Sequence, residues 1–298
     1  MDFPLQEKHN RTEEILQEAK CDYKLELFPH QLLVAANEVA AVNMDRSPTI
    51  CNARLRARGL AWMISGYSFV FRGQRAHKDE KLISETWAEE IKAVRFRRKH
   101  LFFRQNTDLE NLFACAASEW FITDQESRRP IRPTDLLNPA EPELWQAFCP
   151  ELTPFKVKRL TAFSDEGEGE VANSFFCDFH ADYSDLDCNN HLNNTRYLAF
   201  SLDSLFRYLT EEQADILPML QIKEIHLNFV AEVLPLETLR IFLKPRTQVK
   251  QQEISFTYQG KTVCYDEQEA LLAYDLEGYN LTRNQTAFRA QIILARCE

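Results

Sequence analysis

Glycine is scarce in this chain, with only 7 glycines among 298 residues. Neither GxGxxG nor GxxxxGK[ST] occurs, so the common glycine-rich phosphate loops cannot form. The eight cysteines contain no CxxC pair and no short-spaced Cys/His cluster. This pattern excludes the usual zinc-binding spacings and favours reduced thiols in a cytoplasmic protein. We therefore expect no nucleotide cofactor, no other cofactor and no metal.

Basic residues are outnumbered, with 35 Lys and Arg against 45 Asp and Glu and a formal net charge of -10. Such a balance repels the phosphate backbone of nucleic acids. No apolar run approaches the ~18 residues that a membrane-spanning helix needs, and the first 20 residues lack the apolar core of a targeting signal. Hydrophobic residues make up 45% of the chain, enough for packed cores. We predict a globular protein with no integral membrane segment and no nucleic-acid partner.

Two halves of the chain repeat one order of predicted elements, namely a strand, an apolar helix and a run of antiparallel strands. The first half is predicted to contain a strand at 22–28, a helix at 30–44, and strands at 60–71, 81–91, 94–104 and 112–124. The second half is predicted to contain a strand at 171–183, a helix at 194–209, and strands at 222–230, 236–244, 250–258, 269–278 and 287–296. A short helix is also expected at 11–19.

The helix predicted at 194–209 is apolar over most of its circumference, so it should be wrapped by a sheet rather than laid on a surface. The predicted class is α+β, with two tandem hot-dog domains, each a curved antiparallel sheet wrapped around a long central helix. Prolines and the acidic run "DEGEGE" suggest a linker between them. The expected boundaries are an N-terminal extension at 1–20, a first domain at 21–135, the linker at 136–170 and a second domain at 171–298.

A polar stretch, "DLDCNNHLNN" at 185–194, directly precedes the second predicted helix. Asp187, Asn189 and His191 lie two residues apart, and in an extended segment alternate side chains point to the same side. They would converge beside a helix N-terminus, whose unpaired amides can hold an oxyanion. A carboxylate, an amide and an imidazole there could hydrolyse an acyl group. The alternative is that the stretch serves only as a turn and a cap, with Asn193 or Asn194 capping the helix.

The stretch "DCNNHLNNTRY" resembles the acyl-acyl carrier protein thioesterases of bacteria and plant plastids, which carry Asp-x-Asn-x-His followed by Asn-Asn and a helix. Further segments are similar to that family in the family's order: "AWMISGYSFVF", "ETW" at 85–87, "RFRRKHLFFR" and "SEWFITDQESRRPIRP". Together the similarities cover about residues 60–135 and 175–235. The resemblance supplies the function that the spacing alone left open.

The family also uses a glutamate on the strand after the second helix, and the matching residue in "IHLNFVAEV" is Glu232. By this resemblance, Glu232 and His191 position and deprotonate a water molecule. Asn189, with amides of the helix N-terminus, binds the thioester oxygen, and Asp187 orients the network. An alternative makes Asp187 the nucleophile, through an acyl anhydride. Val233 stands where many plant members have cysteine, so a Cys/His mechanism is not expected here.

The resemblance implies hydrolysis of fatty acyl-acyl carrier protein, which releases free fatty acid and ends chain elongation in fatty acid biosynthesis. The acyl pocket would lie in the first domain and the catalytic residues in the second. The implied partner is acyl carrier protein with a phosphopantetheine-linked acyl chain, and a homodimer is one arrangement of the enzyme. The alternatives are a non-catalytic acyl-binding protein, an acyl-CoA thioesterase and an enoyl-thioester hydratase.

An acidic carrier protein would be repelled by the net charge of this chain unless basic residues cluster locally. Basic runs occur on a predicted strand and in a turn, and a further run lies at alternate positions 54, 56 and 58. The docking candidates are Arg95, Arg97, Lys99, Arg128 and Arg129. The first half has no counterpart of Asp-x-Asn-x-His before its helix, where His30 stands alone and is taken as structural. This predicts one site per chain, in the second half.

Overall fold

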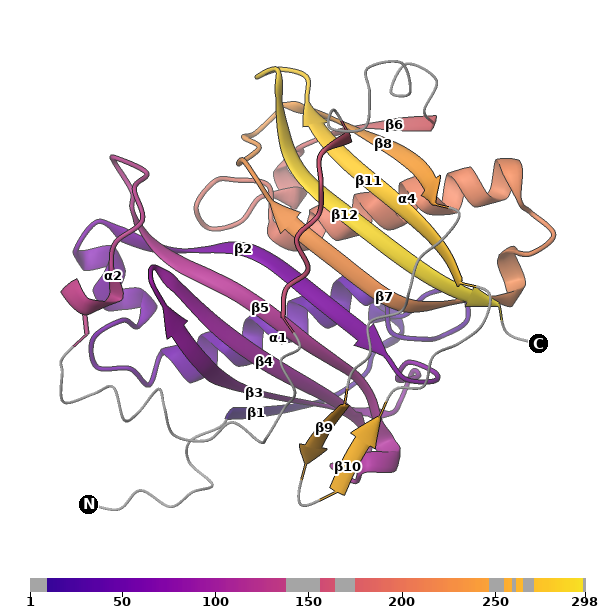
Figure 1. Ribbon diagram of the computed structural model, residues 1–298, viewed down its shortest axis with the longest axis horizontal. Helices are drawn as coiled ribbons and strands as arrows, with labels where there is room; N and C mark the ends of the chain where they lie inside the picture. Colours follow the sequence, from indigo (N-terminus) through magenta and orange to yellow (C-terminus); the bar gives the residue numbers. More distant parts are fainter. Residues whose placement is uncertain are drawn as a thin grey trace. The chain divides into compact units, whose positions relative to one another are not determined.

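The computed structural model describes residues 10–137, 156–163, 175–246, 255–258, 261–264 and 271–296. Contacts within the chain divide it into two compact units (Figure 1). The first comprises Met1–Val157 with Ile254–Tyr265, and the second comprises Lys158–Glu253 with Asp266–Glu298. The boundary after Val157 falls inside the linker predicted at 136–170, most of which lies outside the described residues.

The first unit contains an antiparallel sheet in the strand order β1-β3-β4-β5-β2. Its strands are β1 (Asn10–Ile15), β2 (Leu60–Phe71), β3 (Lys81–Lys92), β4 (Arg95–Arg104) and β5 (Leu112–Asp124). Its helices are α1 (Pro29–Met44) and α2 (Asn52–Ala57), and short 3-10 turns lie at Glu18–Lys20, Leu109–Asn111 and Pro133–Asp135. A separate hairpin pairs β9 (Ser255–Tyr258) with β10 (Lys261–Cys264).

Helix α1 packs on one face of this sheet, as Figure 1 shows. Leu32, Leu33 and Val39 on the helix are at most 1% exposed, which is the burial expected of an apolar helix covered by a sheet. The hydroxyl of Tyr67 on β2 donates to the side-chain oxygen of Asn37 at 3.0 Å. The helix is therefore held to the sheet by a partly buried hydrogen bond as well as by apolar packing.

The second unit contains a sheet in the order β7-β12-β11-β8-β6, with helix α4 (Asn194–Glu212) against it. Its strands are β6 (Phe175–His180), β7 (Leu220–Phe229), β8 (Thr238–Arg246), β11 (Leu271–Asn280) and β12 (Gln285–Arg296). Short 3-10 turns lie at Tyr183–Asp185 and Leu217–Met219. Ring contacts of Tyr197 on α4 with Phe229 and Phe288, at 5.5 and 5.2 Å between centroids, join the helix to β7 and β12.

The two sheets have the same connectivity. In each unit the strand before the long helix pairs with the second strand after it, β1 with β3 and β6 with β8. Taken in chain order, the remaining strands also occupy the same places in each sheet. The repeat of architecture predicted from the sequence is thus visible in the topology, and the predicted α+β class is confirmed.

The helix predicted at 11–19 is wrong, because Asn10–Ile15 forms the edge strand β1. Residues of β1 pair with β3, and the guanidinium of Arg11 contacts the buried carboxylate of Glu85 at 2.9 Å. A helix here would leave Glu85 without this cation, so tertiary pairing overrides the helical pattern. The first unit consequently begins within the predicted N-terminal extension.

One further prediction in the first half, the strand at 22–28, is wrong. Residues 22–28 form a turn rather than a strand, with Leu25 at φ 61°. Residues 54, 56 and 58 lie in or just after the short helix α2, where alternate positions do not share a face. Strand 250–258 is reduced to β9 in its described part, and contacts assign it to the first unit.

Two histidines are fully buried, His100 on β4 and His226 on β7. Burial is the largest cause that holds the pKa of His100 well below its usual range, and Arg98 and Lys99 lower it further. The ring nitrogen Nε2 of His100 lies 3.1 Å from the Ser118 hydroxyl. The folded state therefore holds this imidazole in its neutral form.

We expect His100 to make the fold acid-sensitive. Below pH ~6.5 the unfolded chain binds a proton at His100 that the folded chain does not, so stability present above that pH is lost as pH falls, by up to ~1.4 kcal/mol per pH unit. In His100→Gln, the fall in Tm between pH 7 and pH 5 should be smaller than in the wild type. His77→Gln, at an exposed position, should leave the wild-type slope unchanged. Equal slopes in the His100→Gln and wild-type proteins would contradict the assignment.

Candidate active site

The segment before helix α4 is a tight turn closed by Asp187. The backbone N–H of Asp187 donates to the carbonyl of His191 at 2.8 Å, and the Asp187 carboxylate accepts from the backbone N–H groups of Asn189 and His191 at 2.8 and 3.2 Å. Asn190 has φ 60°, a left-handed conformation that asparagine tolerates better than most residues. The Asp187 carboxylate therefore fixes the path of the backbone around the turn.

The imidazole of His191 faces the carboxylate of Glu232, with Nε2 and Oε2 3.4 Å apart. The two side chains are 15% and 24% exposed, so a water molecule can reach them. The flanking residues hold the two loops together, because the N–H of Leu192 donates to the carbonyl of Val233 at 2.8 Å and both residues are buried. The structure thus joins a residue before α4 to a residue after β7.

A bulge at the end of β7 places Glu232 beside His191. The N–H groups of Val230 and Ala231 both donate to the carbonyl of Ala287, at 2.8 and 3.0 Å. Two residues opposing one is the signature of a β-bulge, which shifts the alternation of side chains along the strand. Simple alternation from the buried residues of β7 would have put Glu232 on the wrong face.

The extended course predicted for residues 187–191 is wrong, because the segment folds into a tight turn. Asn189 is exposed near the tip of the turn, and among the described residues its side chain has no hydrogen-bond partner. His191 faces Glu232, and the Asp187 carboxylate accepts from the backbone of its own turn. Alternation of side chains does not hold across a tight turn.

Helix α4 begins with Asn193 as its N-cap residue, whose side-chain oxygen accepts from the N–H of Thr195 at 3.0 Å. Asn194 is the first helical residue and does not serve as the cap. The cap occupies the Thr195 amide, so this amide is not available to a thioester oxygen. Arg196 in the same first turn pairs with the buried carboxylate of Asp185, with Nε and Oδ1 2.7 Å apart.

Tyr197, near the start of helix α4, is a neighbour of this site. It is 4% exposed, and burial is the largest cause that raises the pKa of its hydroxyl. A backbone hydrogen bond with Val233 opposes the rise in this pKa, while the charges of Asp187 and Glu232 add to it. The phenol therefore stays protonated close to both carboxylates. The sequence feature that could have indicated this neighbour of the site is an aromatic residue three positions after the Asn-Asn pair.

The first unit contains the same turn before its own helix. Asp22 accepts at Oδ1 from the N–H groups of Lys24 and Glu26 at 2.8 and 3.1 Å, and its own N–H donates to the Glu26 carbonyl at 2.8 Å. Leu25 takes the left-handed conformation that Asn190 takes in the second unit. The expectation that the first half lacks a counterpart of the motif is wrong as far as the turn is concerned.

The chemistry of the two turns differs at the position of His191. Glu26 stands there in the first unit, and its carboxylate lies 2.7 Å from the guanidinium of Arg75. Arg75 precedes Ala76, whose carbonyl accepts from the N–H of Leu27 at 2.8 Å, as Val233 accepts from Leu192 in the second unit. Arg75 therefore corresponds to Glu232. An ion pair replaces the imidazole and carboxylate, so the first unit carries the turn without a general base.

The docking candidates on β4 are not all exposed. Lys99 is 1% exposed and its ammonium lies 3.4 Å from a carboxylate oxygen of Glu89, so the prediction that Lys99 docks the carrier protein is wrong. Arg97 contacts the buried carboxylate of Glu119 at 3.3 Å, and Arg95 lies 3.7 Å from the same residue. Cations at alternate positions of a strand indicate that they lie on one face of the sheet. They do not indicate whether other parts of the protein cover that face.

Arg128 and Arg129 are exposed in the turn after β5, so they remain candidates for docking. Arg128 has φ 59°, as expected at a tight turn. Within the described ranges, no helix is long and apolar enough to cross a membrane. The same ranges hold no group of three or more His, Cys, Asp and Glu side chains placed to bind a metal ion.

Fold and site together define an α+β protein of two similarly connected units, in which one unit carries a paired imidazole and carboxylate at the start of its long helix. Residues 168–281 match the family model of the acyl-ACP thioesterase C-terminal domain. A relative from Arabidopsis thaliana, oleoyl-acyl carrier protein thioesterase 2, chloroplastic, is 25% identical over 179 residues, which cover 58% of this chain and 46% of that relative. The chain thus spans about half the length of this relative.

Solved structures show the same fold. An acyl-ACP thioesterase from Bacteroides thetaiotaomicron has a TM-score of 0.72 with 16% identity, over 98% of this chain and 100% of that one. The 12:0-ACP thioesterase from Umbellularia californica has a TM-score of 0.69 with 13% identity, over 97% and 94% of the two chains. With the matched domain, these similarities confirm the resemblance to the acyl-acyl carrier protein thioesterase family.

Proposed function

We propose that this protein hydrolyses the thioester of fatty acyl-acyl carrier protein and releases free fatty acid, which ends chain elongation. The observation that carries the proposal is the 3.4 Å approach of His191 to Glu232, at the start of an apolar helix and within the matched domain. An imidazole and a carboxylate that water can reach are the parts needed to generate a nucleophilic water at neutral pH. The carrier protein as substrate follows from the family resemblance.

In this mechanism Glu232 and His191 hold a water molecule and remove its proton as it attacks the thioester carbon. Proton transfer by a positioned base contributes roughly 10²- to 10⁴-fold to the rate. Asn189, exposed near the tip of the turn, is the proposed donor to the thioester oxygen. The amide of Thr195 is excluded from this role because Asn193 already accepts from it.

Asp187 is a positioning residue in this proposal. Its equivalent Asp22 makes the same backbone contacts in the first unit, where Glu26 stands in place of His191, so the turn uses this aspartate irrespective of catalysis. The Asp187 carboxylate places the backbone N–H of His191, and with it the imidazole. In the alternative in which Asp187 attacks the thioester, Oδ2 would be the attacking atom, because Oδ1 accepts two backbone hydrogen bonds.

Asparagine should replace Asp187 with a small effect. Its side-chain oxygen can still accept from the backbone N–H groups of Asn189 and His191, so kcat should stay within about ten-fold of wild type, whereas Asp187→Ala loses the acceptor and should cost more. Single-turnover measurements on the two variants check this order. If Asp187 were the nucleophile, both variants would be equally inactive, and hydrolysis in ¹⁸O-water would label the Asp187 carboxylate of the wild type.

We further propose that the two units are tandem hot-dog domains, the first containing the acyl pocket and the second the catalytic residues. The shared strand order and the long helix on each sheet support this reading. Of the predicted docking cations, Arg95, Arg97, Arg128 and Arg129 stay candidates for the acidic carrier protein. The dispersed cysteines favour a cytoplasmic protein, and a homodimer stays a proposal.

A thiol-release assay with acyl carrier protein substrates of several chain lengths tests the proposed function. We expect release of the carrier thiol and of free fatty acid, with a preference for one range of chain lengths. Binding of acyl carrier protein without thiol release would instead indicate a non-catalytic acyl-binding protein. Faster turnover of acyl-CoA would indicate a coenzyme A thioesterase, and hydration of an enoyl thioester would indicate a hydratase.

A further inference from the structure

The loop of residues 230–237 carries Glu232 and ends in a tight turn. The N–H of Glu237 donates to the carbonyl of Leu234 at 3.2 Å, and Leu236 between them has φ 64°. Leucine is disfavoured in this left-handed conformation, so the turn persists only because contacts around it stabilise it. These contacts therefore also influence where the loop holds Glu232.

The buried carboxylate of Glu237 provides these contacts. Its Oε2 accepts from the backbone N–H of Leu234 and from the side-chain amide of Asn280, both at 2.7 Å. Its Oε1 accepts from Nε of Arg283 at 2.5 Å. Burial alone would raise the pKa of Glu237, but the hydrogen bonds that it accepts outweigh burial and lower this pKa. The carboxylate therefore stays charged while it joins the loop to the hairpin between β11 and β12.

Asn280 and Arg283 form a rigid base for this carboxylate. The side-chain oxygen of Asn280 accepts from the N–H groups of Thr282 and Arg283 at 3.1 and 3.2 Å, which fixes the tip of the hairpin. Glu237 is 8% exposed and Asn280 is fully buried, so the contact between them lies away from solvent, where charge-assisted hydrogen bonds are strong. We refer to Glu237, Asn280 and Arg283 together as the Glu237 clamp.

The first unit contains the equivalent turn at residues 77–80. The N–H of His77 donates to Oε2 of Glu80 at 2.7 Å, the N–H of Glu80 donates to the carbonyl of His77 at 3.1 Å, and Asp79 has φ 67°. Within the described residues, the Glu80 carboxylate has no amide or guanidinium partner like those of the Glu237 clamp. One carboxylate therefore suffices to close such a turn, and the clamp is an addition in the unit that carries Glu232.

The Glu237 clamp reaches Glu232 through the backbone of Val233 and Leu234. The clamp binds the N–H of Leu234, and the N–H of Leu192 donates to the carbonyl of Val233 at 2.8 Å. On the other side of Glu232, the bulge at the end of β7 fixes the preceding residues. Glu232 is therefore held from both sides, which restricts the positions that its carboxylate can take relative to the imidazole.

We propose that Glu237 and Arg283 are positioning residues that hold the Glu232 carboxylate against the imidazole of His191. The inference rests on the proposed function, because it assigns the clamp a role in the removal of a proton from water. A reacting group that is displaced by ~1 Å can lose about 10²-fold in rate. Since the clamp acts through the backbone, its loss should lower kcat and leave KM nearly unchanged.

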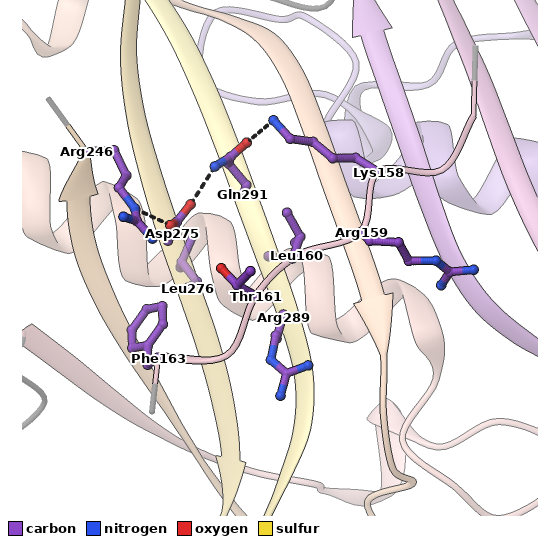
Figure 2. A pocket seen from close by; sticks show the side chains of 11 residues that line it. Lys158, Arg159, Leu160, Thr161, Phe163, Arg246, Asp275, Leu276, Arg289 and Gln291 are labelled. Carbon is purple, nitrogen blue, oxygen red and sulfur yellow. Dashed lines mark hydrogen bonds and ion pairs between the residues drawn. The ribbon is translucent and has the colours of Figure 1, made fainter. Parts of the chain in front are cut away.

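Arg283→Gln removes the cation of the clamp and leaves the carboxylate of Glu237 buried. We expect kcat for thiol release from acyl carrier protein to fall about ten-fold or more, with KM within about two-fold of wild type, and Arg283→Lys to restore part of the loss. Arg246→Gln is the matched control. Arg246, at the far end of β8, pairs with Asp275 at 2.5 Å (Figure 2), and its side chain is 36% exposed against 34% for Arg283. An equal loss of kcat in Arg246→Gln would overturn the proposal.

The two equivalent carboxylates provide a second matched pair. Glu237→Gln removes the charge that binds Arg283, and Glu80→Gln makes the same change in the equivalent turn of the first unit. The kcat should fall about ten-fold or more in Glu237→Gln and stay at the wild-type value in Glu80→Gln. Equal effects would mean that closure of either turn, rather than the position of Glu232, limits activity, and would overturn the proposal.

Hydrogen exchange of backbone amides tests the positioning without a substrate. In Arg283→Gln, the amide of Leu234 should exchange at least about ten-fold faster than in the wild type, whereas the amide of His77 in the first unit should be unchanged. Unchanged exchange at Leu234 would overturn the proposal even in an active thioesterase, and so would faster exchange with an unchanged kcat. A wild-type protein that releases no thiol would instead overturn the proposed function, and exchange at Leu234 would still decide whether the clamp holds the loop.

Discussion

Glutamine in place of Glu232 is expected to lower kcat by roughly 10²- to 10⁴-fold, because the amide cannot accept the proton that a carboxylate or its paired imidazole removes from water. The change keeps the size of the side chain, and Glu232 is 24% exposed, so the fold should be unaffected. Single-turnover thiol release from acyl carrier protein measures the loss. Glu211→Gln, at an exposed position near the end of α4, is the matched control and should keep full activity.

The effects of substituting His191 and Glu232 should be coupled. His191 and Glu232 lie 3.4 Å apart and are proposed to act on one water molecule, so the double variant His191→Gln with Glu232→Gln should be little worse than either single variant. If the loss of kcat in the double variant equalled the product of the two single losses, the residues would act separately. A Glu232→Gln variant with more than about a tenth of wild-type kcat would remove Glu232 from the mechanism.

Alanine in place of Gly278 is expected to destabilise the second unit by about 3 kcal/mol or more, since overpacking a rigid core exceeds the cost of most substitutions. Gly278 on β11 lies opposite Phe288 on β12, and an added Cβ would lie 1.9 Å from a ring carbon of Phe288. Phe288 is fully buried and packs on Tyr197, so its ring has no space to move into. Denaturant unfolding of the full chain measures the loss.

The origin of this loss can be separated by two further variants. Gly73→Ala is the control for backbone strain alone, because Gly73 has φ 72° and an added Cβ there meets nothing within 4 Å; it should cost only ~1 kcal/mol. Phe288→Leu combined with Gly278→Ala should be more stable than the sum of the single effects predicts, since the smaller side chain relieves the clash. Strict additivity would contradict a clash between these residues.

Strands with strong periodicity were predictable from the sequence, and the site loop was only partly so. Strands 60–71 and 112–124 have the predicted bounds, because their β-branched and aromatic residues fill a sheet that is buried on both faces. Segment 11–15 reads as helix by local propensity but pairs with β3 through Arg11 and Glu85. Such a partner, 74 residues away in the sequence, leaves no local signal.

The equivalence of the two turns could not be predicted from local sequence patterns either. Asp22 and Asp187 close identical turns, yet the sequence "DYKLEL" reads as an alternating strand and "DCNNHL" as a polar loop. The hydrogen bonds that create each turn run from one carboxylate to two backbone amides, and such bonds are compatible with many side chains at the intervening positions. The side-chain patterns of the two segments therefore differ, although their backbone hydrogen bonds are the same.

The sequence by itself determined the class of the fold, the repeat of one architecture, the polar stretch before the second helix and the family that it resembles. These follow from local periodicity and from residue types, which are properties of short segments. The tertiary structure decided that His191 faces Glu232, that the Asp187 carboxylate accepts from the backbone of its own turn and that Lys99 is buried. Each of these results depends on a bulge, a turn or a covered sheet face. Such features bring residues together in space, and the separation of these residues along the chain does not predict the contact.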